Sequence, residues 1–396
     1  MIAWLSQVVA VTLLSLRTVP QRLASSSVAV VGVAAVAGVL VAVLSMAVGF
    51  RATMMRTGEP DSVMVLRAGA DAEMTSIIEG SALKIIPDAP GLARGPRGPI
   101  ASAELFVIVD LPKRSTGMSA QVPLRGIGTE GFLFRPRLRI VEGRRFETGR
   151  NEVIVGRGAA ANFANLGVGS VLNLGENRWE VVGIFDGGGT AADSELWCDA
   201  NVLAPAYRRG NTRQAVYARL ESPQALTRFR DALTSDPRLN VKVMRESDYY
   251  AEQSVFLFRL ITSLGVLVGA LMGIGAIFAA VNTMYSAVAS RTREIAVLRA
   301  LGFGGGPVVV SVLTESMLLA LLGGIAGGLV AFLGFNGYQA ATFNLQSFRA
   351  VAFAFAVTPR LVVSAVIYAV VIGFLGGIFP AFRAARLPVV VALREL

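Results

Sequence analysis

The chain has 396 residues, of which 54% are hydrophobic and 16% charged, and its mean hydropathy is +0.59. A chain of this length with so few charged residues is too apolar for an ordinary soluble protein. We therefore expect it to lie in a membrane. The absence of histidine and the presence of one cysteine, Cys198, remove the usual zinc and copper ligands, histidine-based triads and any internal disulfide. No lysine follows a glycine, as a phosphate-binding P-loop requires, so the chain is not expected to be an ATPase itself.

The charge is unevenly distributed along the chain. Residues 51–255 hold 26 of the 37 basic and 24 of the 27 acidic side chains, so this polar stretch is nearly neutral while the whole chain carries +10. A nucleic-acid-binding protein would carry its basic excess on the polar domain, so no nucleic-acid partner is expected. The excess arginines instead flank apolar segments, a pattern typical of cytoplasmic loops. They are Arg17, Arg22, Arg291, Arg293, Arg299, Arg383, Arg386 and Arg394.

Four apolar runs, charge-free except for Glu315 in the third, are long enough to span a bilayer, which takes about 20 residues as a helix. They lie at 27–50, 260–290, 308–333 and 361–382. A cleaved signal peptide is the alternative for the first run, but such peptides have only roughly 7–15 apolar residues, so a retained helix is expected. The apolar residues 2–16, with Trp4 near their start, are expected to form a helix in the membrane interface before a turn at Pro20, with a buried helix of a soluble core as the alternative.

The expected fold is therefore a multi-pass α-helical membrane protein with four transmembrane helices and a large α+β extracytoplasmic domain between the first and second. Arginine-rich ends placed inside give cytoplasmic N- and C-termini in the bacterial inner membrane. Arg259, Arg349 and Arg360 then lie at the outer boundary, where their stems reach the headgroups. The expected boundaries are an interfacial helix at 1–26, transmembrane helices at 27–50, 256–290, 308–335 and 360–382, the extracytoplasmic domain at 51–255, a cytoplasmic helix at 291–307, an external loop at 336–359 and a cytoplasmic tail at 383–396.

The polar domain alternates short β-rich runs with helical ones. Ser222 and Pro223 predict a helix to about Leu233, with the serine as its N-cap and the proline in its first turn. About 200 residues are enough to bury a core, in one lobe or in two. Strands are expected at 62–67, 104–109, 152–155, 179–185, 216–220 and 240–244.

Small residues recur every four positions in the spanning helices. Gly265, Gly269 and Gly273 lie on one face of the second helix, and Ala34, Gly38 and Ala42 have the same spacing in the first. Such faces let another backbone approach closely. Because four helices leave little room for a pore within one chain, we interpret these faces as a dimer interface. The alternative is that they pack against helices of the same chain.

The cytoplasmic turn after the second span predicts a short amphipathic helix. Ile295, Leu298 and Leu301 follow one another at three-residue steps, and Gly302 is a natural helix stop. Such a helix can lie on the membrane or dock into a groove of another protein, and spacing does not choose between the two.

Here the sequence resembles a family. Residues 293–302, REIAVLRALG, resemble the coupling helix of the FtsX-like ABC permeases, the group of macrolide-exporter and lipoprotein-releasing permeases. ESMLLALLGG at 315–324 is similar to the same family's third helix, and PAFRAAR at 380–386 to its C-terminal end. The one-plus-three arrangement of helices is also the family's.

The resemblance continues in the polar domain. VEGRRF at 141–146 and NEVIVG at 151–156 are similar to the start of the family's external module, and LGVGS at 166–170 and WEVVGI at 179–184 continue it. Together these motifs cover about half of the chain, in the family's order. One departure lies near the C-terminus, where Pro388 and Val391 occupy positions that are commonly acidic in the family.

The resemblance implies a permease that converts ATP binding and hydrolysis by separate cytoplasmic ATPases into movement of its external domain, with substrate handled outside the membrane. A second permease copy, identical or related, would pack through the first two helices. This chain would bind no cofactor and no metal; ATP and Mg would be held by the ATPase. The implied ATPase-coupling residues are Arg291, Arg293, Glu294, Ile295, Leu298, Arg299 and Leu301.

Alternatives remain open. A non-transporting regulator would use the same movement to activate a periplasmic cell-wall hydrolase, whereas an exporter would engage a periplasmic adaptor and an outer-membrane channel. A receptor without an ATPase and an enzyme are disfavoured. Glu315, two turns into the third helix, either contacts the ATPase or a neighbouring helix, or reaches to the cytoplasmic surface, which we favour. Membrane lipids are the remaining expected partner; the cargo is not indicated.

Overall fold

The computed structural model describes residues 2–18, 23–96, 98–344 and 349–387. The chain divides into two compact units. The helical unit comprises Met1–Val48, Leu260–Tyr338 and Phe355–Leu396, and the sheet unit comprises Gly49–Arg259 and Gln339–Ala354. Some residues singled out in the sequence lie outside the described ranges. They are Pro20, Arg22, Pro388, Val391 and Arg394.

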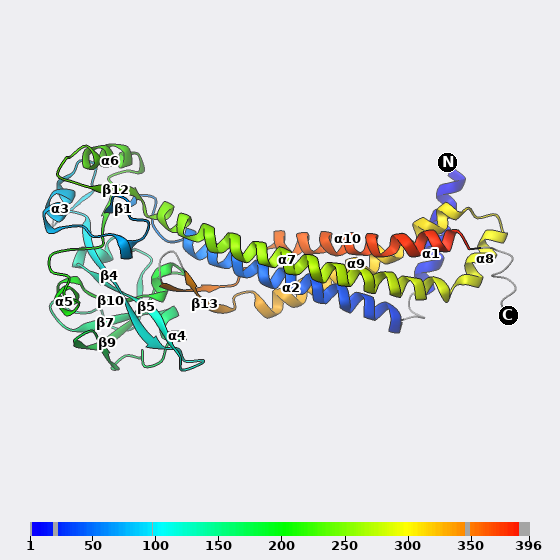
Figure 1. The fold of residues 1–396 in the computed structure, drawn as a ribbon, viewed down its shortest axis with the longest axis horizontal. Coiled ribbons are helices and arrows are strands. Elements are labelled where there is room, and N and C mark those ends of the chain that lie inside the picture. The colour runs from blue at the N-terminus through cyan, green and yellow to red at the C-terminus, as the bar shows by residue number, and fades with distance from the viewer. Residues whose placement is uncertain (1, 19–22, 97, 345–348, 388–396) are drawn as a thin grey trace. The chain divides into compact units, whose positions relative to one another are not determined.

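Four helices of the described chain are long and apolar enough to cross a membrane, which confirms the predicted number and the one-plus-three order. Two of them, α2 and α7, extend beyond the runs expected from hydropathy, and α7 alone has 44 residues. Figure 1 shows the four long helices α2, α7, α9 and α10 running alongside one another. Their bounds are α1 (Ile2–Thr18), α2 (Leu23–Met55), α7 (Glu246–Ala289), α8 (Thr292–Ala300), α9 (Gly305–Phe335) and α10 (Pro359–Ala385).

Small residues allow α9 and α10 to pack closely. A side chain on Gly324 would meet Val366 and Ala369, and one on Gly373 would meet Ser316 and Ala320. Close approach of this kind favours helix association where no water remains to be expelled. The start of α10 follows a conventional signal, because Thr358 accepts a hydrogen bond from the Leu361 amide at 3.4 Å through its Oγ1.

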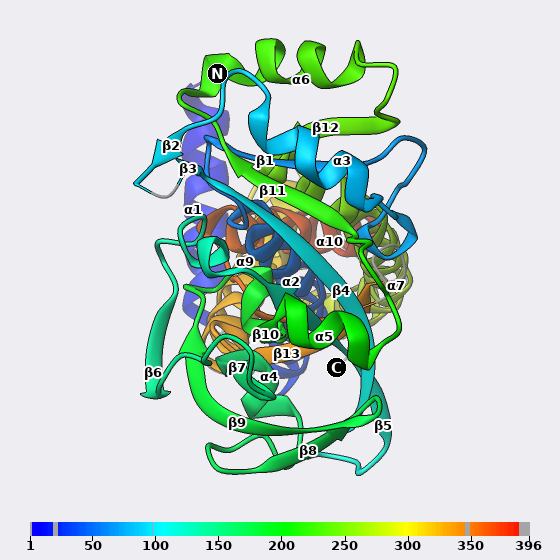
Figure 2. The ribbon, with the colours of Figure 1, turned by 90° about the vertical axis from the view of Figure 1, so that its left-hand side faces the viewer.

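The sheet unit is built on one ten-stranded mixed sheet with the order β12-β1-β11-β4-β5-β10-β7-β9-β6, and β8 pairs with β9. All six predicted strands are present within about four residues of their expected ends. Figure 2 shows β4 running obliquely between β11 and β5. The strands are β1 (Ser62–Arg67), β4 (Ala101–Pro112), β5 (Ser119–Ile127), β6 (Arg139–Gly143), β7 (Glu152–Gly156), β8 (Val171–Leu174), β9 (Asn177–Asp186), β10 (Leu196–Asp199), β11 (Ala215–Arg219) and β12 (Val241–Arg245).

Short helices and a small hairpin complete the sheet unit. The α-helices are α3 (Gly80–Ile85), α4 (Arg157–Asn162), α5 (Ala200–Ala206) and α6 (Leu226–Thr234), and the hairpin is β2 (Arg94–Gly95) with β3 (Gly98–Pro99). The 3-10 turns are η2 (Glu73–Thr75), η3 (Ile86–Asp88), η4 (Thr129–Phe132), η5 (Ala191–Ser194) and η6 (Pro223–Ala225). The predicted cap at Ser222 was wrong in detail: this residue precedes η6, its side chain makes no capping hydrogen bond, and the α-helix begins three residues after Pro223.

The sheet unit has two lobes that share β4. In the first lobe, Ala101 to Glu104 of β4 pair with β11, and the apolar core includes Val63, Val216 and Phe229. In the second lobe, Leu105 to Pro112 of β4 pair with β5, and the main core includes Trp179. One strand therefore connects two separate hydrophobic cores, so the two-lobed alternative is the one observed.

The segment expected to be an external loop, 336–359, holds a hairpin of β13 (Gln339–Asn344) and β14 (Arg349–Ala354). The hairpin belongs to the sheet unit. The amide of Ala352 donates to Ser194 Oγ at 2.6 Å, and the Phe353 ring meets the Phe50 ring edge-on at 5.6 Å. The sequence analysis did not predict the hairpin, whose strands pair with each other and whose packing partners, Ser194 and Phe50, lie far away along the chain.

Candidate functional site

The short helix α8 lies between α7 and α9 in sequence and is the site that the sequence singled out. Its buried residues, Ile295 and Ala296, face inward, and Ile295 packs in a cluster with Met284 of α7 and Val312 of α9. The chain leaves the helix through Gly302, whose φ of +93° is a left-handed conformation that glycine adopts without strain. The predicted helix and its stop are therefore both present.

The predicted apolar side of α8 was wrong at its far end. Ile295 is buried and Leu298 is partly buried, but Leu301 is 72% exposed. The reason is that α8 ends at Ala300, so Leu301 belongs to the following turn and leaves the helical periodicity. Val297 is also exposed, so the outer surface of α8 combines apolar side chains with the exposed Arg293 and Glu294.

Both ends of α8 are attached to neighbouring helices by arginines. At the start, Arg291 Nη1 lies 2.9 Å from Glu315 Oε2 of α9. At the end, the Arg299 guanidinium donates to the backbone carbonyl of Ala385 in α10. These two predicted coupling residues therefore act within the helical unit, and Arg293, Glu294, Val297 and Leu301 form the outward surface of the segment.

The predicted position of the Glu315 side chain was also wrong. We favoured a side chain reaching to the cytoplasmic surface, but its carboxylate is 3% exposed and is paired with Arg291. The alternative interpretation, contact with a neighbouring helical segment, is the one observed. An ionisable group inside a helix bundle is costly unless it has such a partner, and the arginine that precedes α8 supplies it.

The small-residue faces of α2 and α7 were predicted to form a dimer interface, and the structure contradicts this. A side chain on Gly38 would lie 3.3 Å from the Gly327 carbonyl oxygen of α9, and Gly327 in turn faces the backbone of Ala34. Gly265 would meet Val43 of α2 at 2.8 Å. Helices of the same chain therefore pack at these positions, as the alternative interpretation predicted.

The remaining members of the two series agree with that conclusion. A side chain on Gly269 would approach Leu40 of α2 to 2.9 Å, and Gly273 faces the Tyr368 hydroxyl of α10. Tyr368 also donates to the Gly269 carbonyl at 2.7 Å. Ala42 is partly buried. The predicted dimer interface was therefore wrong for the five residues that face helices of the same chain, and for Ala42 it stays a prediction.

Comparison with known proteins assigns both units. Residues 266–389 match the model of the FtsX-like permease C-terminal region, and residues 26–236, more than half of the chain, match the MacB-like periplasmic core domain. The chain belongs to the MacB/FtsX family of ABC transporter permeases. It is accordingly a multi-pass membrane protein, and its periplasmic core domain lies in the sheet unit from residue 49 onward.

Relatives of this permease include longer proteins. It is 25% identical over 299 residues to the macrolide export ATP-binding/permease protein MacB 1 of Aeromonas hydrophila, over 69% of this chain and 43% of that protein. It is 23% identical over 266 residues to an uncharacterized ABC transporter permease of Methanocaldococcus jannaschii, over 64% of this chain and 65% of that one. The crystal structure of the periplasmic region of MacB from Actinobacillus actinomycetemcomitans aligns with 13% identity and a TM-score of 0.38, covering 49% of this chain and 92% of that one. The permease thus spans less than half of the Aeromonas protein.

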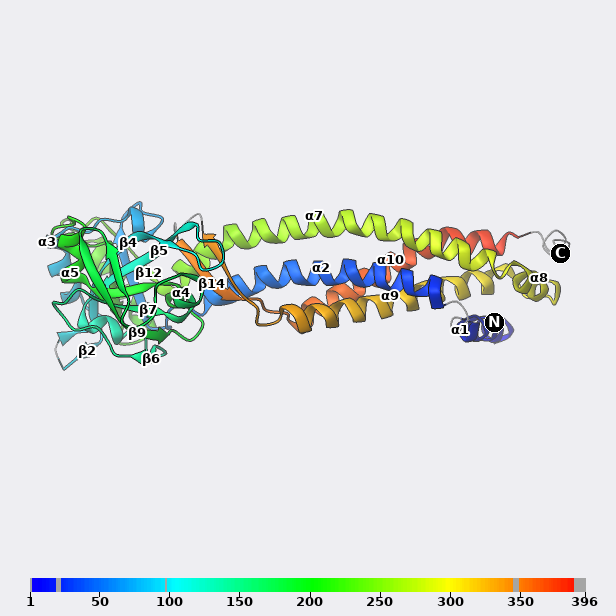
Figure 3. The ribbon, with the colours of Figure 1, turned by 90° about the horizontal axis from the view of Figure 1, so that it is seen from below.

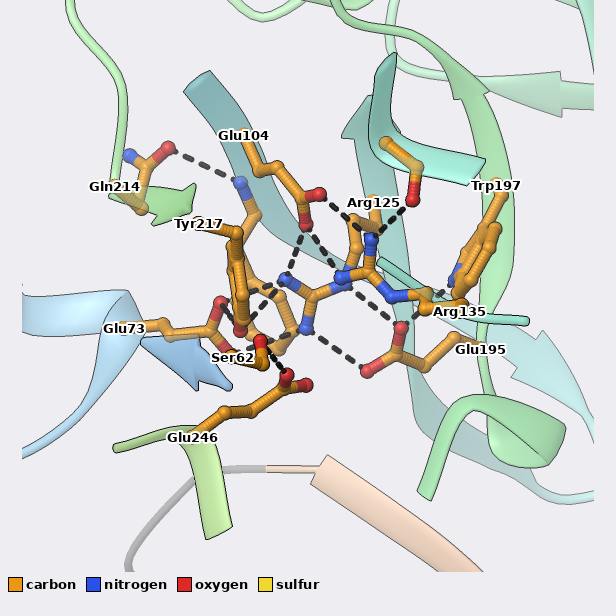
Figure 4. Close-up of polar contacts among 12 residues, drawn as sticks. Ser62, Glu73, Glu104, Arg125, Arg135, Glu195, Trp197, Gln214, Tyr217 and Glu246 are labelled. Atoms are coloured by element: carbon orange, nitrogen blue, oxygen red, sulfur yellow. Dashed lines mark hydrogen bonds and ion pairs between the residues drawn. The ribbon is translucent and has the colours of Figure 1, made fainter. Parts of the chain in front are cut away.

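The periplasmic core domain contains a buried charge cluster that the sequence did not predict (Figure 4). At its centre is Arg125 of β5, which is 1% exposed. Its guanidinium bonds to both carboxylate oxygens of Glu73 at 2.7 and 3.0 Å, to both of Glu195 at 2.8 and 3.0 Å, and to Glu104 at 3.0 Å. The guanidinium also contacts the Tyr217 hydroxyl at 3.3 Å, so its five N–H donors are all used and the two hydrogens of Nη1 are shared among three acceptors. The charge cluster comprises Glu73, Glu104, Arg125, Arg135, Glu195 and Glu246.

The carboxylates of the charge cluster have further partners. Arg135 forms a second two-pronged pair with Glu104 at 2.8 and 2.9 Å. The Tyr217 hydroxyl donates to Glu73 at 2.8 Å, and the Trp197 indole donates to Glu195 at 2.8 Å. Burial alone would lower the pKa of Arg125, but Glu195 and Glu73 outweigh it and the pKa is raised well above its usual value. Both arginines are therefore fixed cations.

Glu246, the first residue of α7, lies beside these charges. Ser62 donates to its carboxylate at 2.6 Å. Burial raises the pKa of Glu246 although Arg135 opposes the shift. The charge cluster joins both lobes, because Glu73 precedes the first-lobe helix α3 whereas Arg125 and Glu195 belong to the second lobe. The partners of Arg125 lie 21 to 92 residues away from it along the chain, which explains why no local pattern revealed the charge cluster. The only signal was an arginine inside the apolar strand β5.

Proposed function

We propose that the permease is the transmembrane subunit of an ABC transporter, and that a separate cytoplasmic ATPase docks on α8 and moves the periplasmic core domain. The observation that supports this is the arrangement of α8. Its inner face is packed on α7 and α9, its ends are held by Arg291 and Arg299, and Val297 and Leu301 stay exposed. A short helix held from within, with an apolar and charged outer surface, is suited to fit a groove of a partner.

The residues of the chain support a transporter in which ATP hydrolysis takes place in a separate subunit. It has no P-loop lysine, and the described residues contain no group of three or more metal-ligating side chains. ATP and Mg would therefore be held by the partner, and this subunit would catalyse no reaction of its own. The Aeromonas relative is named as both ATP-binding protein and permease, which supports pairing this permease with an ATPase. In this proposal both termini and α8 face the cytoplasm, in the inner membrane of a bacterium.

Export is the favoured output. The Aeromonas relative is named for macrolide export and a Pseudomonas entomophila relative for pyoverdine export. The substrate would be handled at the periplasmic core domain, with a second permease copy completing the transporter and an adaptor with an outer-membrane channel as the outer partners. Co-purification of such an adaptor, as opposed to a cell-wall hydrolase, separates export from the regulatory alternative.

The docking surface is tested by Leu301→Asp in the full-length permease. Burying a leucine contributes about 1.5–3 kcal/mol, so its replacement by a charge should weaken ATPase binding by roughly tenfold or more. The permease is purified from its native membrane, and bound ATPase is measured as ATP hydrolysis per permease. Leu133→Asp is the matched control, because Leu133 is an exposed leucine of the sheet unit. Equal ATPase activity in the two variants would refute docking at α8.

A further inference from the structure

We propose that Arg291 is a positioning residue that fixes the start of α8 to both α9 and α1, which makes the N-terminal helix α1 part of the coupling site. This inference rests on the proposed function, since it assumes that α8 receives the ATPase. It assigns a role to α1, which from its sequence was only an interfacial helix. It also explains why a buried carboxylate is present in a helix that is otherwise apolar.

The geometry is a three-way contact around one guanidinium. Arg291 Nη1 donates to Glu315 Oε2 at 2.9 Å and Nη2 lies 3.5 Å from Glu315 Oε1. The same Nη2 donates to the backbone carbonyl of Ser15, in α1, at 2.8 Å. The side chains of Arg291 and Glu315 are 10% and 3% exposed, so these contacts are shielded from water. One side chain therefore joins the start of α8, the interior of α9 and the C-terminal part of α1.

A second set of contacts holds α1 in place beside α9. The Ser15 and Ser311 hydroxyls are 2.8 Å apart, and Ser311 lies 3.4 Å from the Val11 carbonyl. Val11 is itself buried. Figure 3 shows α1 at the α8 end of the helical unit. The two contacts use different groups of Ser15, whose hydroxyl attaches α1 to α9 and whose backbone carbonyl attaches it to the start of α8.

The chemistry of this contact requires arginine. A guanidinium is planar and presents its donors in a fixed fork, so it can hold a carboxylate with one edge and a carbonyl with another. The compact ammonium of lysine keeps the charge but does not reproduce that fork. Arg291→Lys should therefore retain the ion pair with Glu315 and lose the link to Ser15.

The contact acts on position because α8 is short. A nine-residue helix has little stability alone and takes its orientation from what surrounds it. Arg299, bonded to the Ala385 carbonyl, holds the other end, and Ile295 holds the middle. Loss of the Arg291 contacts would leave the outer surface of α8, including Leu301, unchanged. The first turn of α8 would no longer be fixed. Binding of the ATPase should then persist while the transmission of movement weakens.

The test uses a cysteine-free background, because Cys198 is the only cysteine and can be replaced by alanine. Into it are placed Ser15→Cys and Ser311→Cys, whose native hydroxyls are 2.8 Å apart. Disulfide formation under mild oxidation, measured by the block to alkylation, reports the position of α1 without any ATPase. The second readout is ATP hydrolysis of the co-purified complex, with ATPase bound per permease determined separately.

The variants are Arg291→Met, Glu315→Gln and the exchanged pair Arg291→Glu with Glu315→Arg. We expect Arg291→Met to slow disulfide formation about fivefold or more and to lower turnover per bound ATPase by a similar factor, with binding unchanged. Glu315→Gln keeps the Ser15 contact available, so it should lower turnover more than it slows the cross-link. The exchanged pair restores the ion pair but not the Ser15 contact, so it should recover turnover only in part.

The outcomes separate the two proposals. Unchanged cross-linking and unchanged turnover in Arg291→Met would overturn the positioning role. Lower turnover with an unchanged cross-link would overturn the part assigned to α1. If the unmodified permease binds no ATPase, the proposed function fails, whereas the cross-link still decides whether Arg291 holds α1. A variant that does not fold is detected by gel filtration, and the conservative Glu315→Gln then carries the test.

Discussion

Removal of Arg125 should be the most destabilising single change in the periplasmic core domain. Arg125→Met would leave Glu73 and Glu195, each 2% exposed, without the cation that neutralises both. Removing one member of a buried ion pair typically costs about 3–5 kcal/mol, because the remaining charge stays buried without compensation. Arg125→Lys keeps a cation with three donors in place of five, so its cost should be intermediate.

Tryptophan fluorescence can report this change in the full-length permease in detergent. Trp179 and Trp197 are fully buried in the sheet unit, and Trp4, the third tryptophan, is removed by Trp4→Phe. For a unit of this size 1 kcal/mol shifts the thermal midpoint by roughly 2–4 °C, so Arg125→Met should lower it by roughly 6–20 °C. The matched control is Arg238→Met, which breaks the surface pair with Asp236 and should leave the midpoint unchanged.

Equal midpoints for Arg125→Met and Arg238→Met would refute the reasoning. Such a result would mean that the carboxylates of Glu73 and Glu195 take up protons or find other donors at little cost. An unfolding midpoint of Arg125→Lys no higher than that of Arg125→Met would also contradict it, because charge neutralisation is the larger part of the expected effect.

Two further predictions concern the remaining features. The raised pKa of Glu246 means that the folded protein binds a proton that the unfolded chain releases. The resulting contribution to the free energy of unfolding is complete below the pKa of Glu246 in the unfolded chain, and it is lost as the pH rises through its pKa in the folded protein. The unfolding midpoint of Glu246→Gln, followed from pH 4 to 8 in about unit steps, should lack that decline, and parallel curves for the variant and the parent would count against it. Gly327→Ala places a side chain on the backbone of Ala34 and should cost about 1–3 kcal/mol in Trp4-monitored unfolding. Gly275→Ala, which meets nothing within 4 Å, should be neutral or stabilising by up to about 1 kcal/mol, and similar effects at both glycines would show that this contact is absent.

The sequence determined the elements whose signals are local. Each membrane helix contains a long apolar run, interrupted only by Glu315 in α9, and a helix satisfies its own backbone hydrogen bonds in the membrane. The strands of the sheet unit were found for a similar reason, since β-branched runs such as 152–155 are bounded by turn residues. The α8 segment combined both kinds of signal, an amphipathic pattern and a glycine stop, so it could be placed before its neighbours were known.

Tertiary structure decided which partner each side chain has. Gly38 carries the same four-residue spacing whether it faces a second copy or its own chain, and only the position of Gly327 showed that its own α9 fills the space. Glu315 could have reached to the surface, but Arg291, 24 residues away, approaches it closely enough to pair. Arg125 gave almost no signal, because its carboxylate partners come from three separate segments of the chain. Local patterns specify helices and strands through backbone hydrogen bonding and hydrophobic periodicity, whereas the pairing of buried charges depends on which distant segments the fold brings together.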